Sequence, residues 1–350
     1  MKSLWRVFKF FLILLLVAIV LVFALRAVND WRYRAPSQEG AESLRTQAMR
    51  SDPEVQALLS GAGGEVRVEP LGEEGALGFH LMPEHKLHPG VVVCTGGSEG
   101  SPNLETARFL AQQGFETCAV TFFGGKGQRP TLSKIPLEGF GEVLQALEGV
   151  ASEVHPLTLL GQSKGAEYFA HVALHFDPVD NLVLIAPSAY TFAGLDFGDY
   201  GSSWTWQGKE LPYVDLKKGS LTASLKDMVV PMLLKSPIRF RRIYSSAVEK
   251  DPQAEEKRIP LEGFKGRVLL IAGQDDQLWD SASMAQTLVL HKRDATLALY
   301  PQAGHLFWVP QGLVSFEQGR LLTGGTAEGN QRAALQSTVK LMHFLLESQR

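Results

Sequence analysis

A serine between glycines is the first feature of this sequence that could do chemistry. Residues 161–165, Gly-Gln-Ser-Lys-Gly, follow a short apolar run and precede a helical pattern that starts at Ala166. In a sharp strand-to-helix turn only small residues fit on either side of the serine, whose hydroxyl then projects at the carboxyl end of the strand. The backbone N–H of the next residue, Lys164, would point at the negative oxygen that forms when a carbonyl is attacked. The pattern predicts that Ser163 is a nucleophile.

A second segment has the same form, so the pattern alone does not settle which serine reacts. Residues 96–100 read Gly-Gly-Ser-Glu-Gly directly after an early apolar run, and Ser-Pro-Asn at 101–103 delays the next helix. This loop fits better as the second half of an oxyanion hole, with a backbone N–H of Gly97 or Ser98 as the donor. We therefore predict Ser163, and not Ser98, as the nucleophile.

An acid and a base follow Ser163 in the chain order that this kind of turn uses. Asp275 and Asp276 come after one late apolar run, and His305 comes after the next. His305 would take the proton of the serine and return it to the leaving group, while an aspartate holds its working tautomer. Adjacent side chains point in different directions, so only one aspartate can face the histidine. We choose Asp276, and expect Asp275 to order the turn or to cap the helix after it.

Metal, cofactor and nucleic-acid chemistry are not indicated. His171 and His175 are four residues apart, but no third ligand completes a metal site, so we expect neither a metal nor a cofactor. A net charge of -3 gives no basic surface for nucleic acid. Cys94 and Cys118 lie in apolar runs and are expected to be buried thiols. A single bridge between them is the alternative if their strands are neighbours in an oxidising compartment.

The elements that must position these residues alternate between short apolar strands and helices. Continuous apolar runs of this kind predict a mostly parallel sheet covered by helices on both faces, with right-handed connections. The expected class is α/β, an α/β-hydrolase fold, with a hairpin over residues 65–82 ahead of it. Strands are expected at 91–94, 117–123, 157–160, 182–185, 268–271 and 296–300, and helices at 104–113, 137–149 and 166–175.

Composition divides the chain of 350 residues into an anchor at 1–34, a linker at 35–64 and one α/β domain at 65–350. The linker is polar and rich in glycine and proline, with one short helix expected around residues 53–59. With 45% hydrophobic residues the chain can fill a sizeable single core.

The regular alternation stops from about residue 187 to 264. An insertion of this size between two sheet strands commonly covers a site as a cap, and an irregular surface excursion is the alternative. Trp204 and Trp206 lie in this insertion, and Trp279 follows the aspartate pair. We take these three tryptophans as candidate substrate-binding residues for an apolar ligand.

The N-terminal segment has the composition of a membrane helix. Sixteen uncharged residues separate Lys9 from Arg26. A helix of that length spans about 24 Å, which snorkelling of the two basic side chains can extend toward a hydrocarbon core of about 30 Å. The segment lacks a good small-residue cleavage site, so we predict an uncleaved single-pass anchor and not a signal peptide. Three basic residues flank the run on each side, so charge does not decide orientation, and we expect the domain outside the cytoplasm.

Several segments together resemble the catalytic domain of the acyl-CoA thioesterase and bile acid-CoA:amino acid N-acyltransferase family. The two most specific are Gln-Ser-Lys-Gly-Ala-Glu at 162–167 and Gly-Gln-Asp-Asp-Gln-Leu-Trp at 273–279, and the likeness runs from about Pro89 to the end of the chain. The resemblance implies an α/β-hydrolase fold, a triad on the predicted serine, aspartate and histidine, and acyl transfer from a thioester to water or an amine. Further matching segments lie at 97–100, 135–138, 204–208, 211–213, 303–305 and 324–326.

Two features depart from that family. Its acyl-CoA-using members carry a β-sandwich domain before the catalytic one, and residues 35–88 are too few for it; the anchor is also atypical. Outside the cytoplasm the substrate would be an ester, lipid or peptide-like acyl donor, and beside a cytoplasmic bilayer it would be acyl-CoA.

The expected function is that of a serine hydrolase that cleaves acyl thioesters or esters through an acyl-enzyme on Ser163. One alternative is an acyltransferase that uses an amine or hydroxyl acceptor. The other is a non-catalytic, membrane-bound binding protein on the same scaffold.

Overall fold

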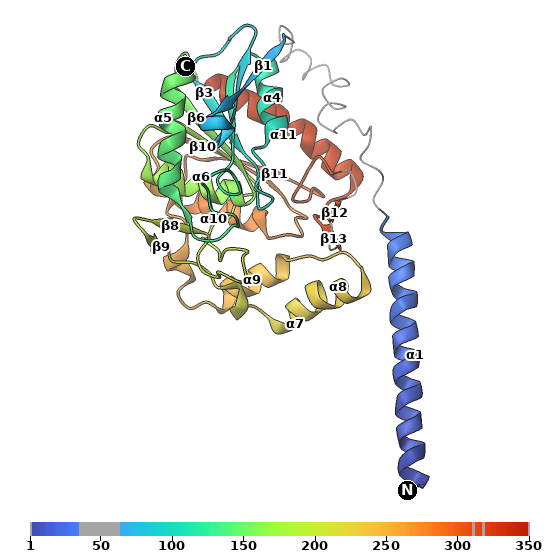
Figure 1. Cartoon of the computed structure of the whole chain (residues 1–350). Helices are drawn as coiled ribbons and strands as arrows, with labels where there is room; N and C mark the ends of the chain where they lie inside the picture. Colours follow the sequence, from blue (N-terminus) through green and yellow to red (C-terminus); the bar gives the residue numbers. More distant parts are fainter. Residues whose placement is uncertain (1, 35–63, 310–311, 317–318, 349–350) are drawn as a thin grey trace.

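The computed structural model describes residues 2–34, 64–309, 312–316 and 319–348 (Figure 1). A long helix, α1 (Lys2–Arg32), stands beside an α/β domain that contains all the other described elements. The short helix expected around residues 53–59 lies outside the described residues.

The domain is built on an eight-stranded sheet in the order β1-β2-β4-β3-β6-β7-β10-β11. The first two strands form an antiparallel hairpin, which confirms the hairpin expected over 65–82, and β2 also pairs antiparallel with β4. All later neighbours are parallel. The bounds are β1 (Val66–Leu71), β2 (Gly78–Pro83), β3 (Val91–Thr95), β4 (Glu116–Val120), β6 (Leu157–Gln162), β7 (Asn181–Ile185), β10 (Arg267–Gly273) and β11 (Thr296–Tyr300).

Helices cover both faces of this sheet, as the continuous apolar strands predict. One buried cluster joins the sheet to α5 (Phe140–Val150), α6 (Lys164–His175) and α10 (Ser281–His291). The other joins it to α4 (Leu104–Gln112) and α11 (Ala327–Glu347). The α/β prediction is confirmed.

The two cysteines lie on neighbouring strands but on opposite faces of the sheet. Where β3 pairs with β4, Cys118 is paired with Val93 and Cys94 with Ala119, so the two cysteines are one residue out of register. Side chains alternate between faces along a strand, so Cys118 enters one core cluster and Cys94 the other. Both are buried as expected, and they cannot form a bridge with each other.

The stretch between β7 and β10 holds short elements packed beside the carboxyl ends of the parallel strands. Helices α7, α8 and α9 form a layer along one end of the body (Figure 1). The elements are β8 (Trp204–Trp206) and β9 (Lys209–Glu210), which pair with β5 (Ile135–Pro136), then η3 (Leu216–Lys218), α7 (Leu221–Ser224), the π-helical turn η4 (Leu225–Val229), α8 (Val230–Leu234), α9 (Arg241–Lys250), η5 (Ala254–Lys257) and η6 (Leu261–Gly263). A further hairpin, β12 (Leu313–Phe316) and β13 (Gly319–Leu322), lies next to α8 (Figure 1).

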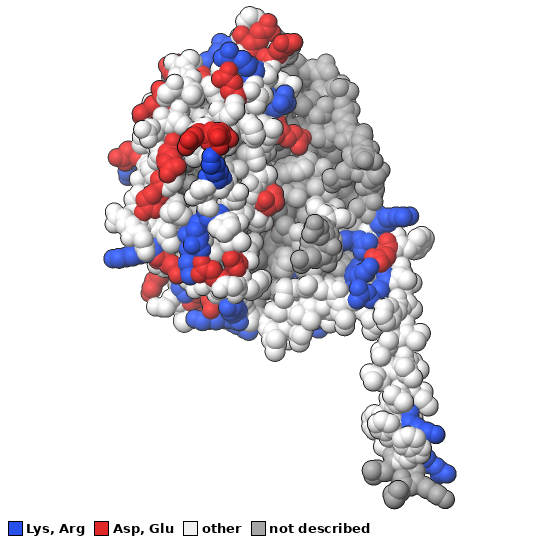
Figure 2. Space-filling model, viewed as in Figure 1, with Lys and Arg blue, Asp and Glu red and all other residues white. Residues whose placement is uncertain are grey.

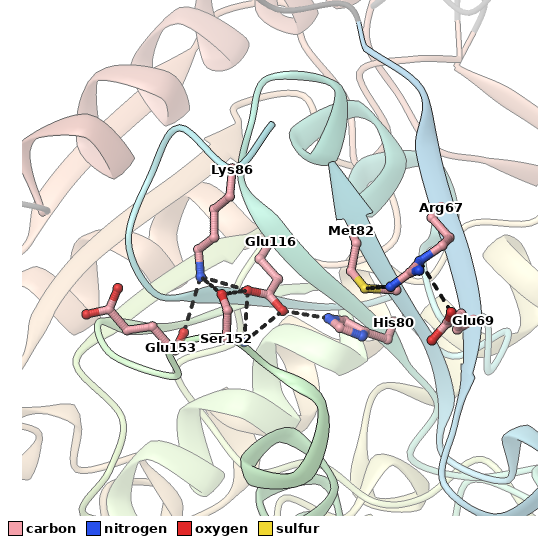
Figure 3. A network of polar contacts seen from close by, with 8 residues as sticks. All are labelled: Arg67, Glu69, His80, Met82, Lys86, Glu116, Ser152 and Glu153. Atoms are coloured by element: carbon pink, nitrogen blue, oxygen red, sulfur yellow. Dashed lines mark hydrogen bonds and ion pairs between the residues drawn. The ribbon is translucent and has the colours of Figure 1, made fainter. Parts of the chain in front are cut away.

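A buried ionic network ties the antiparallel edge of the sheet to the loop after α5 (Figure 3). Glu116 begins β4, and its carboxylate accepts hydrogen bonds from Lys86 at 2.7 Å and from the Ser152 hydroxyl at 2.7 Å. His80 on β2 lies 2.8 Å from the other carboxylate oxygen. Burial raises the pKa of Glu116, but these hydrogen bonds outweigh it and lower the pKa to about 2.

Glu116→Gln is expected to destabilise the domain by on the order of 1–3 kcal/mol at neutral pH. The folded-state pKa lies below the ordinary value of 4.5, so the stabilisation is complete above that value and is lost as the pH falls toward 2. Urea unfolding in detergent at pH 7 and pH 3 measures this. Glu153→Gln is the matched control, because Glu153 contacts Lys86 through its backbone carbonyl only (Figure 3). An equal loss at both pH values would contradict the ionic account.

Candidate active site

Ser163 occupies a strained turn between β6 and α6. Its backbone has φ 55° and ψ -121°, a conformation that residues other than glycine rarely adopt. The flanking glycines are required by close approach: a Cβ on Gly161 would lie 2.3 Å from the Gly165 carbonyl oxygen, and a Cβ on Gly165 would lie 1.9 Å from the Gly96 carbonyl oxygen. The sequence therefore folds here as the nucleophile pattern predicts, with the serine at the carboxyl end of a central strand.

His305 and Asp276 form a buried hydrogen-bonded pair. The His305 Nδ1 lies 2.7 Å from Asp276 Oδ2, and the two side chains are 2% and 0% exposed. The other oxygen, Asp276 Oδ1, accepts from the backbone N–H groups of Leu278 at 2.9 Å and Trp279 at 3.2 Å. A carboxylate only accepts hydrogen bonds, so His305 donates from Nδ1, and in the neutral imidazole Nε2 is then the acceptor.

Asp275 points away from the histidine. Its Oδ2 accepts from the Gly325 backbone N–H at 2.9 Å, and its Oδ1 accepts from the Gln277 side chain at 2.8 Å. Asp275 thus orders the turn, which is the first of the two roles expected for it. The cap of helix α10 is instead Asp280, which accepts from the Ser283 N–H at 3.2 Å.

Ser163 and His305 line the same apolar cavity, which has a volume of about 460 Å³. The hydrogen bonds of the described residues include none between these two side chains; such contacts often tighten only when substrate binds. Most of the other lining comes from the insertion between β7 and β10. It includes Leu195, Phe197, Tyr200, Leu216, Ser224, Met228, Phe240, Ile243 and Tyr244, together with Trp279 and Leu321.

Most of these lining residues could not be predicted from the sequence. Isolated tyrosines and phenylalanines in an irregular segment carry no period that would show which of them turn inward. The aromatic content of the insertion was the only signal available.

Backbone N–H groups that could stabilise an oxyanion lie near Ser163, and one of the expected donors already donates a hydrogen bond to another group. Lys164 begins α6, so no helix carbonyl can accept its N–H, which lies next to the serine. The Gly97 N–H donates to Glu99 Oε1 at 2.9 Å. A Cβ on Gly97 would lie 3.1 Å from the Ser163 Cβ, so this loop is in direct contact with the nucleophile turn. Of the two donors expected from the loop, Ser98 is the one without this bond, and Ser98 lines the cavity.

Only one of the three candidate tryptophans lies in the cavity. Trp279 lines it, with its ring centroid 5.6 Å from that of His305. Trp204 is fully buried and packs against Phe122 and Tyr168, so we correct it to a core residue. Trp206 packs against His175 at 4.4 Å between ring centroids and does not line the cavity. An indole fills either a core or a binding site, and residue type alone does not distinguish them.

The Lys164 side chain makes a buried ion pair that the sequence analysis did not foresee. Its Nζ lies 2.7 Å from Glu167 Oε2, and Glu167 Oε1 accepts from the Trp204 indole at 2.9 Å and the Phe192 N–H at 3.0 Å. Burial lowers the pKa of Lys164, against the opposite effect of Glu167. The pair fastens the first turn of α6 to the insertion. The Lys–Glu spacing of three at the start of a largely apolar helix was its signal in the sequence.

The two histidines on α6 serve packing and hydrogen bonding. His171 Nε2 lies 2.8 Å from the Thr191 hydroxyl, and burial lowers the pKa of His171 to about 3. His175 Nδ1 lies 2.7 Å from the His171 carbonyl oxygen. In the part of the chain that the structure describes, no group of three histidine, cysteine or acidic side chains is placed to hold a metal ion.

The sheet order, the strained serine turn and the buried aspartate–histidine pair define an α/β-hydrolase. Residues 135–347 match the profile of the family described as BAAT / Acyl-CoA thioester hydrolase C terminal. The match covers more than half of the chain, and the chain belongs to this family.

Curated relatives include both thioesterases and acyltransferases. Bile acid-CoA:amino acid N-acyltransferase of Mus musculus is 28% identical over 251 residues, which cover 70% of this chain and 54% of the relative. Acyl-coenzyme A thioesterase 1 of Homo sapiens is 26% identical over 252 residues, 70% of this chain and 55% of the relative. The chain therefore spans just over half the length of these relatives. Among solved structures, the Pyrococcus horikoshii acylaminoacyl peptidase aligns with a TM-score of 0.49 at 11% identity, over 85% of this chain and 44% of that chain.

Proposed function

We propose that this protein is a serine hydrolase that cleaves acyl thioesters or esters through an acyl-enzyme on Ser163. The observation that carries the proposal is that His305, bonded to the buried Asp276, lines the same apolar cavity as Ser163. An idle binding protein on this scaffold would need none of the three residues, and the strained backbone at the serine has no other evident use.

The proposed reaction proceeds in two balanced halves. His305 Nε2 takes the proton from the Ser163 hydroxyl as its oxygen attacks the acyl carbon, and the carbonyl becomes an oxyanion held by the N–H groups of Lys164 and Ser98. The oxyanion collapses, the bond to sulfur or oxygen breaks, and His305 gives its proton to the departing thiol or alcohol. Water then attacks the acyl-enzyme in the same way, which releases the carboxylic acid and restores the serine.

The acyl group is proposed to lie in the cavity next to Ser163. The lining is dominated by aliphatic and aromatic side chains, which suits a hydrocarbon chain better than a polar acyl donor. Relatives named for acyl-coenzyme A make a thioester the first substrate class to assay. A second candidate is transfer of the acyl group to an amine or hydroxyl, because the relatives include N-acyltransferases. Product analysis with and without an amine acceptor separates the two: amide formed at the expense of free acid favours transfer.

We also propose that α1 is an uncleaved membrane anchor. From Trp5 to Arg32 the helix is long and apolar enough to cross a membrane, and its apolar stretch is not buried against the domain. The domain is proposed to lie outside the cytoplasm. A reporter that is active only outside the cytoplasm, fused to the C-terminus, tests on which side of the membrane the domain lies. If that fusion is inactive while a fusion to a reporter that is active only in the cytoplasm works, the domain lies in the cytoplasm.

Labelling with a fluorophosphonate tests the nucleophile. This probe bonds to a serine hydroxyl whose proton is removed by a neighbouring base, with loss of fluoride, so we expect the wild-type chain to be labelled and Ser163→Ala to be blank. Ser98→Ala is the matched control: it removes the hydroxyl of the other glycine-flanked serine but keeps the backbone N–H at position 98, so labelling should remain. Equal labelling of wild type and Ser163→Ala would overturn the proposed function.

A further inference from the structure

The segment 221–234, formed by α7, η4 and α8, turns an apolar surface to the outside. Its exposed apolar side chains are Leu221, Leu225, Val229, Val230, Met232 and Leu233, and within the segment only Thr222 and Lys226 are exposed polar residues. Surface helices normally present polar residues outward, and a contiguous exposed apolar patch marks a surface that something else covers.

The inner side of the same segment is held firmly in place. Asp227 is fully buried and forms ion pairs with Arg239, at 3.0 Å, and with Arg242. Met228 and Ser224 line the cavity that contains Ser163. The outward apolar residues are therefore not loosely placed core residues, because the inward positions are already occupied by fixed groups.

Helix α1 ends against this segment. The Asn29 side chain donates to the Leu234 carbonyl oxygen at 2.8 Å, and Arg26 donates to the Leu233 carbonyl oxygen at 3.4 Å. Asp30 pairs with Lys235 at 2.7 Å and with Arg320 of β13 at 3.2 Å. The end of α8 is thus bonded to the last turns of α1, and the two lie side by side in Figure 1.

These contacts fix the level of the segment relative to a bilayer. Arg26 is the first charged residue after the apolar run of α1, and Asn29 lies about 5 Å further along the helix axis. If α1 crosses a membrane, both residues lie in the headgroup layer, and so does the end of α8 that they contact. Figure 2 shows α1 as a white band between charged groups at its two ends, and the neighbouring end of the body is also largely white.

We propose that the segment 221–234 is a membrane-docking surface, whose occupant is the same bilayer that α1 crosses. The inference rests on the proposed anchor and adds to it a second contact with lipid. Apolar side chains at the interface, carried on short helices beside a span, are the composition of an interfacial element. The docking also places the cavity next to lipid, since one side of the segment faces the bilayer and the other lines the cavity. An acyl chain dissolved in the membrane then reaches Ser163 beside the π-helical turn without crossing bulk water.

Fluorescence quenching in vesicles tests where the segment lies. The full chain is reconstituted in phosphatidylcholine vesicles that contain brominated lipid, with an environment-sensitive dye on one introduced cysteine at a time. The native Cys94 and Cys118 are fully buried and are not expected to react in the folded chain. The sites are Leu15→Cys in α1, Val229→Cys in the segment and Leu290→Cys on α10 as an exposed control.

We expect strong quenching at positions 15 and 229 and little at 290. Quenching at 15 with no more at 229 than at 290 would overturn the docking surface and leave the anchor standing. No quenching at 15 would overturn the anchor, and the docking surface with it. Neither outcome bears on the nucleophile, which the fluorophosphonate label reports separately.

Activity tests the proposed route to the cavity. The double variant Val229→Glu and Leu233→Glu places charge only on exposed positions, so it should fold and hydrolyse a water-soluble short-chain ester as wild type does. We expect its KM for a long-chain acyl ester held in vesicles to rise by about tenfold or more, with kcat for the soluble ester unchanged. Leu290→Glu is the control for added charge. A double variant with an unchanged KM in vesicles would contradict the route.

Discussion

Replacing His305 by alanine is expected to lower kcat/KM by about 10⁴- to 10⁶-fold, as removal of a base from a serine–histidine–aspartate unit does. Without the imidazole, nothing takes the proton of Ser163 at neutral pH, and nothing returns a proton to the leaving group. The fold should persist, because Asp276 keeps the two backbone hydrogen bonds to its other oxygen. Hydrolysis of a chromogenic ester by wild type and variant, with thermal unfolding of both, measures the two effects separately.

Two further measurements distinguish a lost base from a disturbed site. His291→Ala removes an exposed histidine at the end of α10 and should leave the rate within about twofold of wild type. Added imidazole should restore part of the activity of His305→Ala, because a free imidazole fits the space left by the side chain. An alanine variant that keeps a tenth of the wild-type rate would show that His305 is not the base.

Most of the main sheet was predictable because the parallel strands are short, largely apolar runs, several of them followed by a helix. Two helices begin at other residues than predicted. Helix α6 begins at Lys164, not Ala166, because the strained turn at Ser163 leads directly into the first helical residue. The helix expected from residue 137 begins with a 3-10 turn over Leu137–Gly139 before α5.

The small strands and the cap helices could not be read from the sequence. Strands β5 and β9 have two residues each, which is too short for any alternation to register. The segment 221–234 has the opposite problem. Its apolar residues resemble those of a buried helix, and only the placement of α1 beside it gives a reason for their exposure.

The candidate triad was predictable for a topological reason. The carboxyl ends of the parallel strands lie at one edge of the sheet, so residues in the loops that follow β6, β10 and β11 come together there whatever their separation in sequence. Contacts between side chain and backbone within a loop follow no such rule. The hydrogen bond from the Gly97 N–H to Glu99 depends on local loop geometry, and the spacing of those residues does not predict it.

Asp276→Asn is expected to cost about 10⁴-fold in kcat while Asp275→Asn costs about tenfold or less. An amide at 276 can accept from the Leu278 and Trp279 N–H groups through its oxygen, which turns its NH2 group toward His305 Nδ1. That NH2 group donates, so His305 Nδ1 must accept and its proton moves to Nε2. An imidazole with a proton on Nε2 cannot take one from Ser163. The substitution thus preserves shape and volume and changes only the direction of one hydrogen bond.

At position 275 the same substitution meets different partners. The amide oxygen can still accept from the Gly325 N–H, and the contact with Gln277 lies at the exposed side of the turn, so the loop that carries His305 should keep its place. Steady-state kinetics of the two asparagine variants, each with a pH profile between 5 and 9, compare them directly. Because the residues are adjacent and the substitution is identical, differences in expression or general stability largely cancel. Equal losses in the two variants, or a larger loss at 275, would mean that the hydrogen bond between Asp276 and His305 does not set the tautomer on which the proposed mechanism depends.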